Sequence, residues 1–138
     1  MKIQATSIAI GNRAYLITGP SGFGKSSLAL SLIRNGAYLI SDDVTIVDDQ
    51  VAYAPKDYRG WLEVRGVGLI SGFPVCAKAL IAGIIELVPS KPDRIPSDEN
   101  RQIGNQKFPL FRIWNRDMNG ADKVMVIDRM IQGKLRKE

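Results

Sequence analysis

The feature that most constrains this chain is the segment from residue 19 to 26, which reads Gly19-Pro20-Ser21-Gly22-Phe23-Gly24-Lys25-Ser26. It fits the pattern G-x-x-x-x-G-K-S at every position, and it stands between a predicted strand and a predicted helix. Glycines there let backbone N–H groups converge on an anion, and the dipole of the following helix adds positive potential. We therefore predict a P-loop that binds a nucleotide or another polyphosphate, with Lys25 on the terminal phosphates and the Ser26 hydroxyl on Mg²⁺.

The apolar pattern around this loop predicts an α/β fold. Strands are expected at 3–9, 14–17, 37–41, 44–47, 51–54, 79–88 and 108–114, and helices at 26–34 and 121–135. Segment 55–60 is predicted to be a loop or short helix, and 91–107 a polar loop. Because no linker or repeat interrupts the pattern, we expect one domain over 1–138, with a mixed β-sheet flanked by helices.

Composition excludes several classes of function. The 138 residues include 19 basic and 14 acidic side chains, a net charge of +5, without the basic patch and interleaved aromatic residues that are typical of nucleic-acid binding. The longest apolar run, 79–88, is too short to cross a bilayer, and the N-terminus lacks the apolar stretch of a signal peptide. A single cysteine allows no internal disulfide. We expect a cytoplasmic protein without a membrane or nucleic-acid partner.

Two adjacent acids, Asp42 and Asp43, follow the predicted strand 37–41. A parallel neighbouring strand would place them beside the P-loop, at the carboxyl edge of the sheet. Neighbouring residues at a strand end point to opposite faces, so one acid would hold Mg²⁺ through water and the other would meet the nucleophile. The alternative is a solvated turn or a helix cap.

The segment 60–72 contains four glycines and the polar triplet Glu63-Val64-Arg65 among apolar residues. Glycine in such number is expected where the backbone passes close to another group. We interpret this segment as functional.

Together, the P-loop, the acid pair and the segment Leu62-Glu63-Val64-Arg65-Gly66-Val67-Gly68-Leu69-Ile70 resemble the catalytic domain of bacterial HPr kinase/phosphorylase, over about residues 3–94. The resemblance implies an ATP-dependent kinase that phosphorylates a serine of the phosphocarrier protein HPr and reverses this by phosphorolysis, which releases pyrophosphate. It also implies a P-loop core similar to that of phosphoenolpyruvate carboxykinase, and a hexamer.

The resemblance also assigns roles to individual residues. Lys25 would contact phosphate, Ser26 and Glu63 would hold Mg²⁺ with Asp42 as a further candidate, and Asp43 would be the base for the attacking serine. Arg65 lies in the signature segment, and Arg94 matches an arginine of the active site, where it would stabilise charge on the transferring phosphoryl group.

The chain departs from the family pattern at Gln4, where the family carries a histidine. Glutamine does not titrate near neutral pH, so we expect impaired phosphorolysis.

Longer relatives carry an additional N-terminal domain, and this chain would be a short form. By the same resemblance, segment 108–112 would occupy the region that the family uses for dephosphorylation. Two alternatives stay open: a catalytically degenerate sensor of ATP or pyrophosphate that acts through a partner, and a small-molecule kinase or plain NTPase.

Overall fold

The predicted strand–loop–helix unit is present in the computed structural model, which describes residues 1–138. Strand β3 (Arg13–Thr18) leads into the P-loop, and helix α1 (Lys25–Arg34) begins directly after it. The four central residues of β3 are all buried, which shows that both faces of this strand are covered. The P-loop therefore connects a buried strand directly to a helix.

A mixed sheet of nine strands holds this unit, as predicted, and β9 (Lys78–Val88) is its longest member. One edge of β9 pairs in parallel with β3. The other edge pairs antiparallel with β6 (Val51–Tyr53) at its beginning and in parallel with β11 (Gln106–Trp114) at its end. The remaining strands are β1 (Lys2–Gln4), β2 (Thr6–Ile10), β4 (Tyr38–Ser41), β5 (Val44–Asp48) and β10 (Glu99–Ile103).

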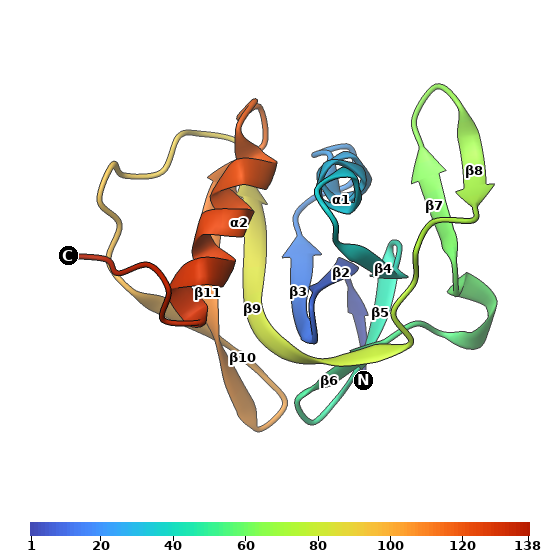
Figure 1. Ribbon diagram of the computed structural model, residues 1–138, viewed down its shortest axis with the longest axis horizontal. Coiled ribbons are helices and arrows are strands. Elements are labelled where there is room, and N and C mark those ends of the chain that lie inside the picture. Colours follow the sequence, from blue (N-terminus) through green and yellow to red (C-terminus); the bar gives the residue numbers. More distant parts are fainter.

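Side chains that alternate along β3 and β9 separate two apolar cores. Tyr15 and Ile85 belong to the core beneath α1 and α2 (Gly120–Ile131), so both helices cover the same face of the sheet (Figure 1). Leu16 and Ile84 belong to the second core, which residues of β5, β6 and β11 enclose on the opposite face. The P-loop follows the end of β3, a strand that lies between these two cores.

A partly buried ion pair connects α2 to β3. The Arg13 guanidinium donates to both carboxylate oxygens of Asp128, at 2.7 and 2.9 Å, and the Tyr15 hydroxyl donates to the same carboxylate at 2.6 Å. Burial alone would raise the pKa of Asp128, but the hydrogen bonds from Arg13 and Tyr15 outweigh it and lower that pKa. The ionised carboxylate therefore stabilises the folded state.

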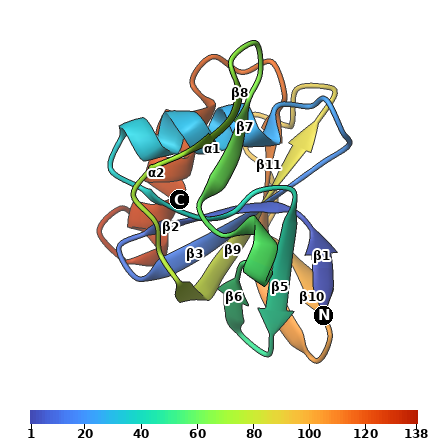
Figure 2. The same cartoon turned by 90° about the vertical axis from the view of Figure 1, so that its right-hand side faces the viewer.

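Strands β7 (Trp61–Val64) and β8 (Gly68–Ser71) form a separate hairpin, entered through the short 3₁₀ turn η1 (Lys56–Tyr58). Figure 2 shows this hairpin standing in front of α1. Leu62 is fully buried in the core beneath the helices and anchors the hairpin there. Val67 at its tip is exposed. The glycine-rich segment singled out in the sequence is thus a projecting arm beside α1.

The structure corrects several predicted boundaries. Segment 91–107 is not a loop throughout, because β10 pairs antiparallel with β11 from Glu99 to Ile103 despite its polar composition. The predicted strand 3–9 is two strands, since the chain changes partner at Ala5 from β5 to β3 and β4. The last helix ends at Ile131. No helix combines the length and apolar character that crossing a membrane would require.

Candidate active site

The glycines of the P-loop stand where no other residue fits without strain. A Cβ on Gly19 would lie 3.2 Å from both the Cβ and the carbonyl oxygen of Leu87, and the φ angle there is +147°. Gly24, directly before α1, has a φ of +93°. Between them the N–H of Phe23 donates to the carbonyl of Pro20 at 3.2 Å. The loop is therefore a tight turn held against β9.

Lys25 lies at the mouth of this loop. Its Nζ donates to the carbonyl oxygens of Gly19 at 2.8 Å and Pro20 at 3.2 Å. Both acceptors are neutral, whereas a phosphate is anionic and attracts the ammonium group more strongly. A bound phosphate would therefore replace the carbonyls as the partner of Lys25.

A cavity of about 570 Å³ lies between the P-loop and the β7–β8 hairpin; we call it the catalytic cavity. It brings together most of the predicted site residues: Ser21, Gly22, Gly24, Lys25, Ser26, Asp42, Asp43, Glu63 and Arg65. Gly19, Pro20 and Phe23 are outside its lining, and Phe23 packs against the core beneath the helices. The lining also contains Leu69 of the signature segment and five residues that the sequence did not single out, namely Thr6, Ser27, Asp57, Tyr58 and Trp61.

The carboxylate of Asp42 connects three elements at this cavity. Its Oδ1 accepts hydrogen bonds from the hydroxyls of Ser26 at 2.7 Å and Thr6 at 2.9 Å, and its Oδ2 accepts one from the backbone N–H of Glu63 at 2.9 Å. Asp42 is only 7% exposed. One buried carboxylate thus holds the first turn of α1, strand β2 and the β7–β8 hairpin in a fixed relation.

Asp43 is exposed, and its backbone is in the left-handed region, with φ +67°. Its N–H donates to the Thr6 hydroxyl at 3.2 Å. The prediction that the two acids point to opposite faces is wrong, because the chain leaves the extended conformation after Ser41 and both acids border the catalytic cavity. An aspartate is among the few residues that tolerate this conformation.

The strand before these acids has no parallel strand as its neighbour, and its one parallel contact is an isolated bridge between Leu39 and Val75. β4 pairs antiparallel with β2, and β2 pairs antiparallel with β3. Two reversals give β4 and β3 the same direction, with one strand between them. Both strands therefore end at the same edge of the sheet, and the acids still reach the P-loop.

The residues present fit a Mg²⁺ that is held mainly by phosphate and water. Ser26 and Asp42 are in contact, and the side chain of Glu63 borders the same cavity. No three acidic, histidine or cysteine side chains converge into a cage of their own. Mg²⁺ usually keeps several waters and binds through one or two carboxylates plus substrate phosphates, and this donor set suits that mode.

Two further predicted residues lie outside the catalytic cavity. Arg94 borders a different cavity, together with Lys91, Lys123 and Arg112 near α2, so the structure does not group it with Lys25. Gln4, which stands at the position of the family histidine, pairs with Val44 in the β1–β5 ladder. Val44 directly follows Asp43, so Gln4 lies beside the proposed base.

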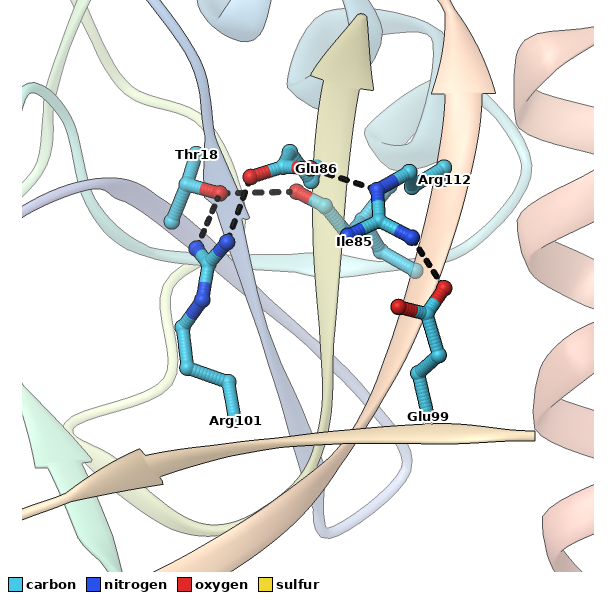
Figure 3. Close-up of polar contacts among 6 residues, drawn as sticks. All are labelled: Thr18, Ile85, Glu86, Glu99, Arg101 and Arg112. Atoms are coloured by element: carbon cyan, nitrogen blue, oxygen red, sulfur yellow. Dashed lines mark hydrogen bonds and ion pairs between the residues drawn. The ribbon is translucent and has the colours of Figure 1, made fainter. Parts of the chain in front are cut away.

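An ion-pair network at the end of β9 escaped sequence reasoning. Glu86 accepts hydrogen bonds from Arg101 and Arg112, and Arg112 also pairs with Glu99 (Figure 3). Partial burial would raise the pKa of Glu86, but the two arginines outweigh it and lower that pKa. Arg101 also donates to the hydroxyl of Thr18, the last residue before the P-loop, at 3.5 Å. The β10–β11 hairpin is thereby fastened to the root of the loop.

Known proteins are similar to this chain in sequence and in fold. The family model for the HPr serine kinase C-terminal domain matches residues 2–102. The HPr kinase/phosphorylase of Lactobacillus acidophilus is 35% identical over 127 residues, which cover 80% of this chain and 39% of that protein. The enzyme of Mycoplasmopsis pulmonis is 31% identical over 129 residues, 82% of this chain and 42% of that protein. The chain thus spans about two fifths of the length of these curated relatives.

A solved structure supports the same fold. The Hpr(Ser) kinase/phosphatase from Coxiella burnetii superposes with a TM-score of 0.81, and the match covers 97% of each chain at 24% sequence identity. This likeness concerns the arrangement of the mixed sheet and its two helices. The family model covers well over half of the chain, including the P-loop, both acids and the β7–β8 hairpin. The chain therefore belongs to the HPr kinase/phosphorylase family and corresponds to its C-terminal domain.

Proposed function

We propose that this chain is a protein serine kinase that transfers the γ-phosphoryl group of ATP to HPr. The observation that carries the proposal is the convergence of Lys25, Ser26, Asp43 and Arg65 on one cavity. A protein that only binds nucleotide has no need of an exposed acid and an arginine beside its P-loop. Family membership supplies the identity of the acceptor, since the relatives are named HPr kinase/phosphorylase.

In the proposed reaction, the serine oxygen of HPr forms a bond to the γ-phosphorus while the bond from that phosphorus to the leaving ADP oxygen breaks. The serine proton passes to the carboxylate of Asp43. Lys25 and Arg65 stabilise the charge on the transferring group. Mg²⁺, when bound at Ser26 and Asp42, neutralises charge on the phosphate oxygens.

The two neighbouring acids, Asp42 and Asp43, have different roles in this proposal. Asp42 is buried, and both of its oxygens already accept hydrogen bonds from within the chain. Asp43 is exposed at the cavity, and only its backbone is engaged, through the Thr6 hydroxyl. Asp43 is therefore the acid that can receive a proton from an incoming serine, while Asp42 positions Ser26.

Further family properties are part of the same proposal. The chain would act as one kinase domain over 1–138, assemble as a hexamer in the cytoplasm, and share its nucleotide-binding core with phosphoenolpyruvate carboxykinase. Phosphorolysis with pyrophosphate would be weak, because Gln4 stands beside Asp43 where the family has a histidine. Arg94 would act in the reaction only if the segment around it, or a neighbouring subunit, brought it to the catalytic cavity.

Gln4 also favours a second candidate, a sensor that binds ATP or pyrophosphate and signals through a partner without transferring phosphate. The family carries a histidine at this position, and replacement of that titratable side chain is expected in a protein that has lost catalysis.

Transfer of labelled γ-phosphate from ATP and Mg²⁺ to HPr of the same organism decides between the two candidates. We expect transfer by the wild type and none by Asp43→Asn, with nucleotide binding intact in both. Nucleotide binding without transfer by either protein would support the sensor. Phosphate release from ATP at the same rate with and without HPr would support a plain NTPase.

A further inference from the structure

The hydroxyl of Thr6 contacts both acids of the catalytic cavity at once. It donates to Oδ1 of Asp42 at 2.9 Å and accepts a hydrogen bond from the backbone N–H of Asp43 at 3.2 Å. We propose that Thr6 is a positioning residue for phosphoryl transfer, which holds the backbone of Asp43 where its carboxylate meets the acceptor serine. This inference rests on the proposed function, in which Asp43 is the base and Asp42 positions Ser26.

The backbone of Thr6 lies within the sheet. Thr6 is the first residue of β2, pairs with Ile17 of β3, and is fully buried although it borders the catalytic cavity. Ser7 pairs with Ser41 in the antiparallel β2–β4 ladder, so Thr6 and Asp42 come next to each other at the end of that ladder. A threonine is branched at Cβ and has few χ1 rotamers, so the direction of its hydroxyl is restricted as well.

The turn at Asp43 is one that requires support. Asp43 has a φ of +67°, and the N–H of Val44 donates to the carbonyl of Asp42 at 2.7 Å across it. A three-residue turn closed in this way, with a positive φ at its centre, is the rarer and more strained kind of γ-turn. Strained backbone persists only where its surroundings hold it. Thr6 accepts from the N–H at the centre of this turn, and the Ser41 hydroxyl donates to the carbonyl of Val44.

The chemistry of the three groups fixes the direction of both hydrogen bonds. A backbone N–H can only donate, so the Thr6 oxygen accepts from Asp43, and its single proton is left for the carboxylate of Asp42. Without the hydroxyl, the N–H of Asp43 would lose its acceptor. Asp42 would still be held by the Ser26 hydroxyl and the N–H of Glu63. The loss would therefore fall mainly on the position of Asp43.

The position of Asp43 matters because a general base must lie within hydrogen-bond reach of the group that it deprotonates. A displacement of about 1 Å can cost about 100-fold in rate. In the proposed function MgATP is held by the P-loop and Lys25, to which the Thr6 hydroxyl makes no hydrogen bond. We therefore expect Thr6 to affect kcat and not the affinity for either substrate.

The test compares Thr6→Val, which keeps the shape of the side chain without its hydroxyl, with Ser7→Ala. Ser7 is the next residue of β2 and is fully buried, and its hydroxyl bonds that of Thr45 at 2.8 Å and neither acid. Both variants lose a buried hydroxyl, so both should lower the urea concentration at the midpoint of unfolding.

Only the variants at position 6 should affect transfer. We expect Thr6→Val to lower kcat for transfer to HPr by at least about tenfold. The KM for HPr and the affinity for MgATP, measured by calorimetry, should stay within about threefold of the wild type. Ser7→Ala should leave all three quantities near the wild type, and Thr6→Ser, which keeps the hydroxyl, should recover most of kcat.

Hydrogen exchange of the Asp43 amide, measured by NMR, gives a readout that does not depend on activity. The amide should be protected in the wild type and in Ser7→Ala, and it should lose this protection in Thr6→Val. Continued protection in Thr6→Val would show that another group holds the turn and would overturn the inference.

Unchanged kcat in Thr6→Val, or an equal fall of kcat in Thr6→Val and Ser7→Ala, would also overturn the inference while leaving the proposed kinase intact. A wild type that binds MgATP but transfers no phosphate would instead refute the proposed function, and the inference with it. If Thr6→Val does not fold, the Asp43 amide of the wild type decides. Slow exchange supports the inference, and exchange at the rate of an unstructured peptide contradicts it.

Discussion

The hydroxyl of Ser26 donates a hydrogen bond to Oδ1 of Asp42 at 2.7 Å, which joins the P-loop to the connection between β4 and β5. The same carboxylate holds the β7–β8 hairpin through the N–H of Glu63. The position of the Ser26 hydroxyl, and with it the proposed Mg²⁺ site, therefore depends on a residue 16 positions away in the chain. Thr6 donates to the same Oδ1 from β2, so three hydrogen bonds maintain this arrangement.

Asp42→Asn should reduce both stability and nucleotide binding. The amide replaces one acceptor oxygen by a donor, so that either the Glu63 N–H or the two hydroxyls face an N–H group in a buried position. We expect a loss of about 1–3 kcal/mol in the free energy of unfolding, measured with urea. Asp43→Asn is the matched control: the position is exposed and asparagine tolerates its left-handed backbone, so stability should change by less than about 0.5 kcal/mol. Equal stability of the two variants would contradict the role given to Asp42.

Lys25→Ala should abolish phosphate binding with little loss of stability. The partners of Lys25 are two carbonyl groups at the mouth of the loop, which water can reach when the ammonium is removed. We expect no measurable MgATP binding by calorimetry and a change of less than about 1 kcal/mol in unfolding free energy. Lys107→Ala, exposed on β11, removes the same charge elsewhere and should bind like the wild type. Unchanged binding by Lys25→Ala would remove Lys25 from the mechanism.

Gln4→His should raise phosphorolysis more than kinase activity. An imidazole beside Asp43 would add a group that titrates near pH 6.5, and the ratio of the two activities should acquire a pH dependence around that value. The measurement is the pyrophosphate-dependent loss of phosphate from phosphorylated HPr between pH 5.5 and 8. Lys2→His, which lies two residues earlier on β1, is the control. If Gln4→His changes neither activity, position 4 does not limit phosphorolysis.

Asp128→Asn should destabilise the protein near neutral pH and much less in acid. The folded-state pKa of Asp128 is lowered, so its contribution is fully present above the unfolded value of about 3.9 and is lost as pH falls through the lower folded value. We expect a loss of about 2–3 kcal/mol in unfolding free energy at pH 7, because Arg13 loses its buried partner. The difference from the wild type should shrink below about pH 4. Asp122→Asn, exposed on the same helix, should show neither effect, and a constant difference at every pH would refute the assignment.

The P-loop was predictable because its structure depends on neighbours within eight residues. Glycines that require a left-handed backbone, a lysine and a serine directly before a helix describe one local conformation, and the structure contains it. The apolar runs of β3 and β9 are also local features, so these two predicted strands and the mixed sheet were confirmed.

Other features were missed because they depend on pairing between distant segments. β10 is polar, and it is a strand only because β11 lies beside it. Glu86 reads as one charge in an apolar strand, and its arginine partners come from a hairpin that the sequence did not predict. The left-handed turn at Asp43, which brings both acids to one cavity, leaves no local mark beyond the acid pair itself.

By itself, the sequence determined that this chain forms a P-loop between a strand and a helix, because that conformation is encoded by residues in direct succession. Only the tertiary structure decided which groups surround the P-loop. Asp42 and Glu63 come together beside this loop because two reversals, through β2, bring the end of β4 to the same edge of the sheet as the end of β3. Those contacts follow from the packing of apolar faces over the whole domain, which no single segment specifies.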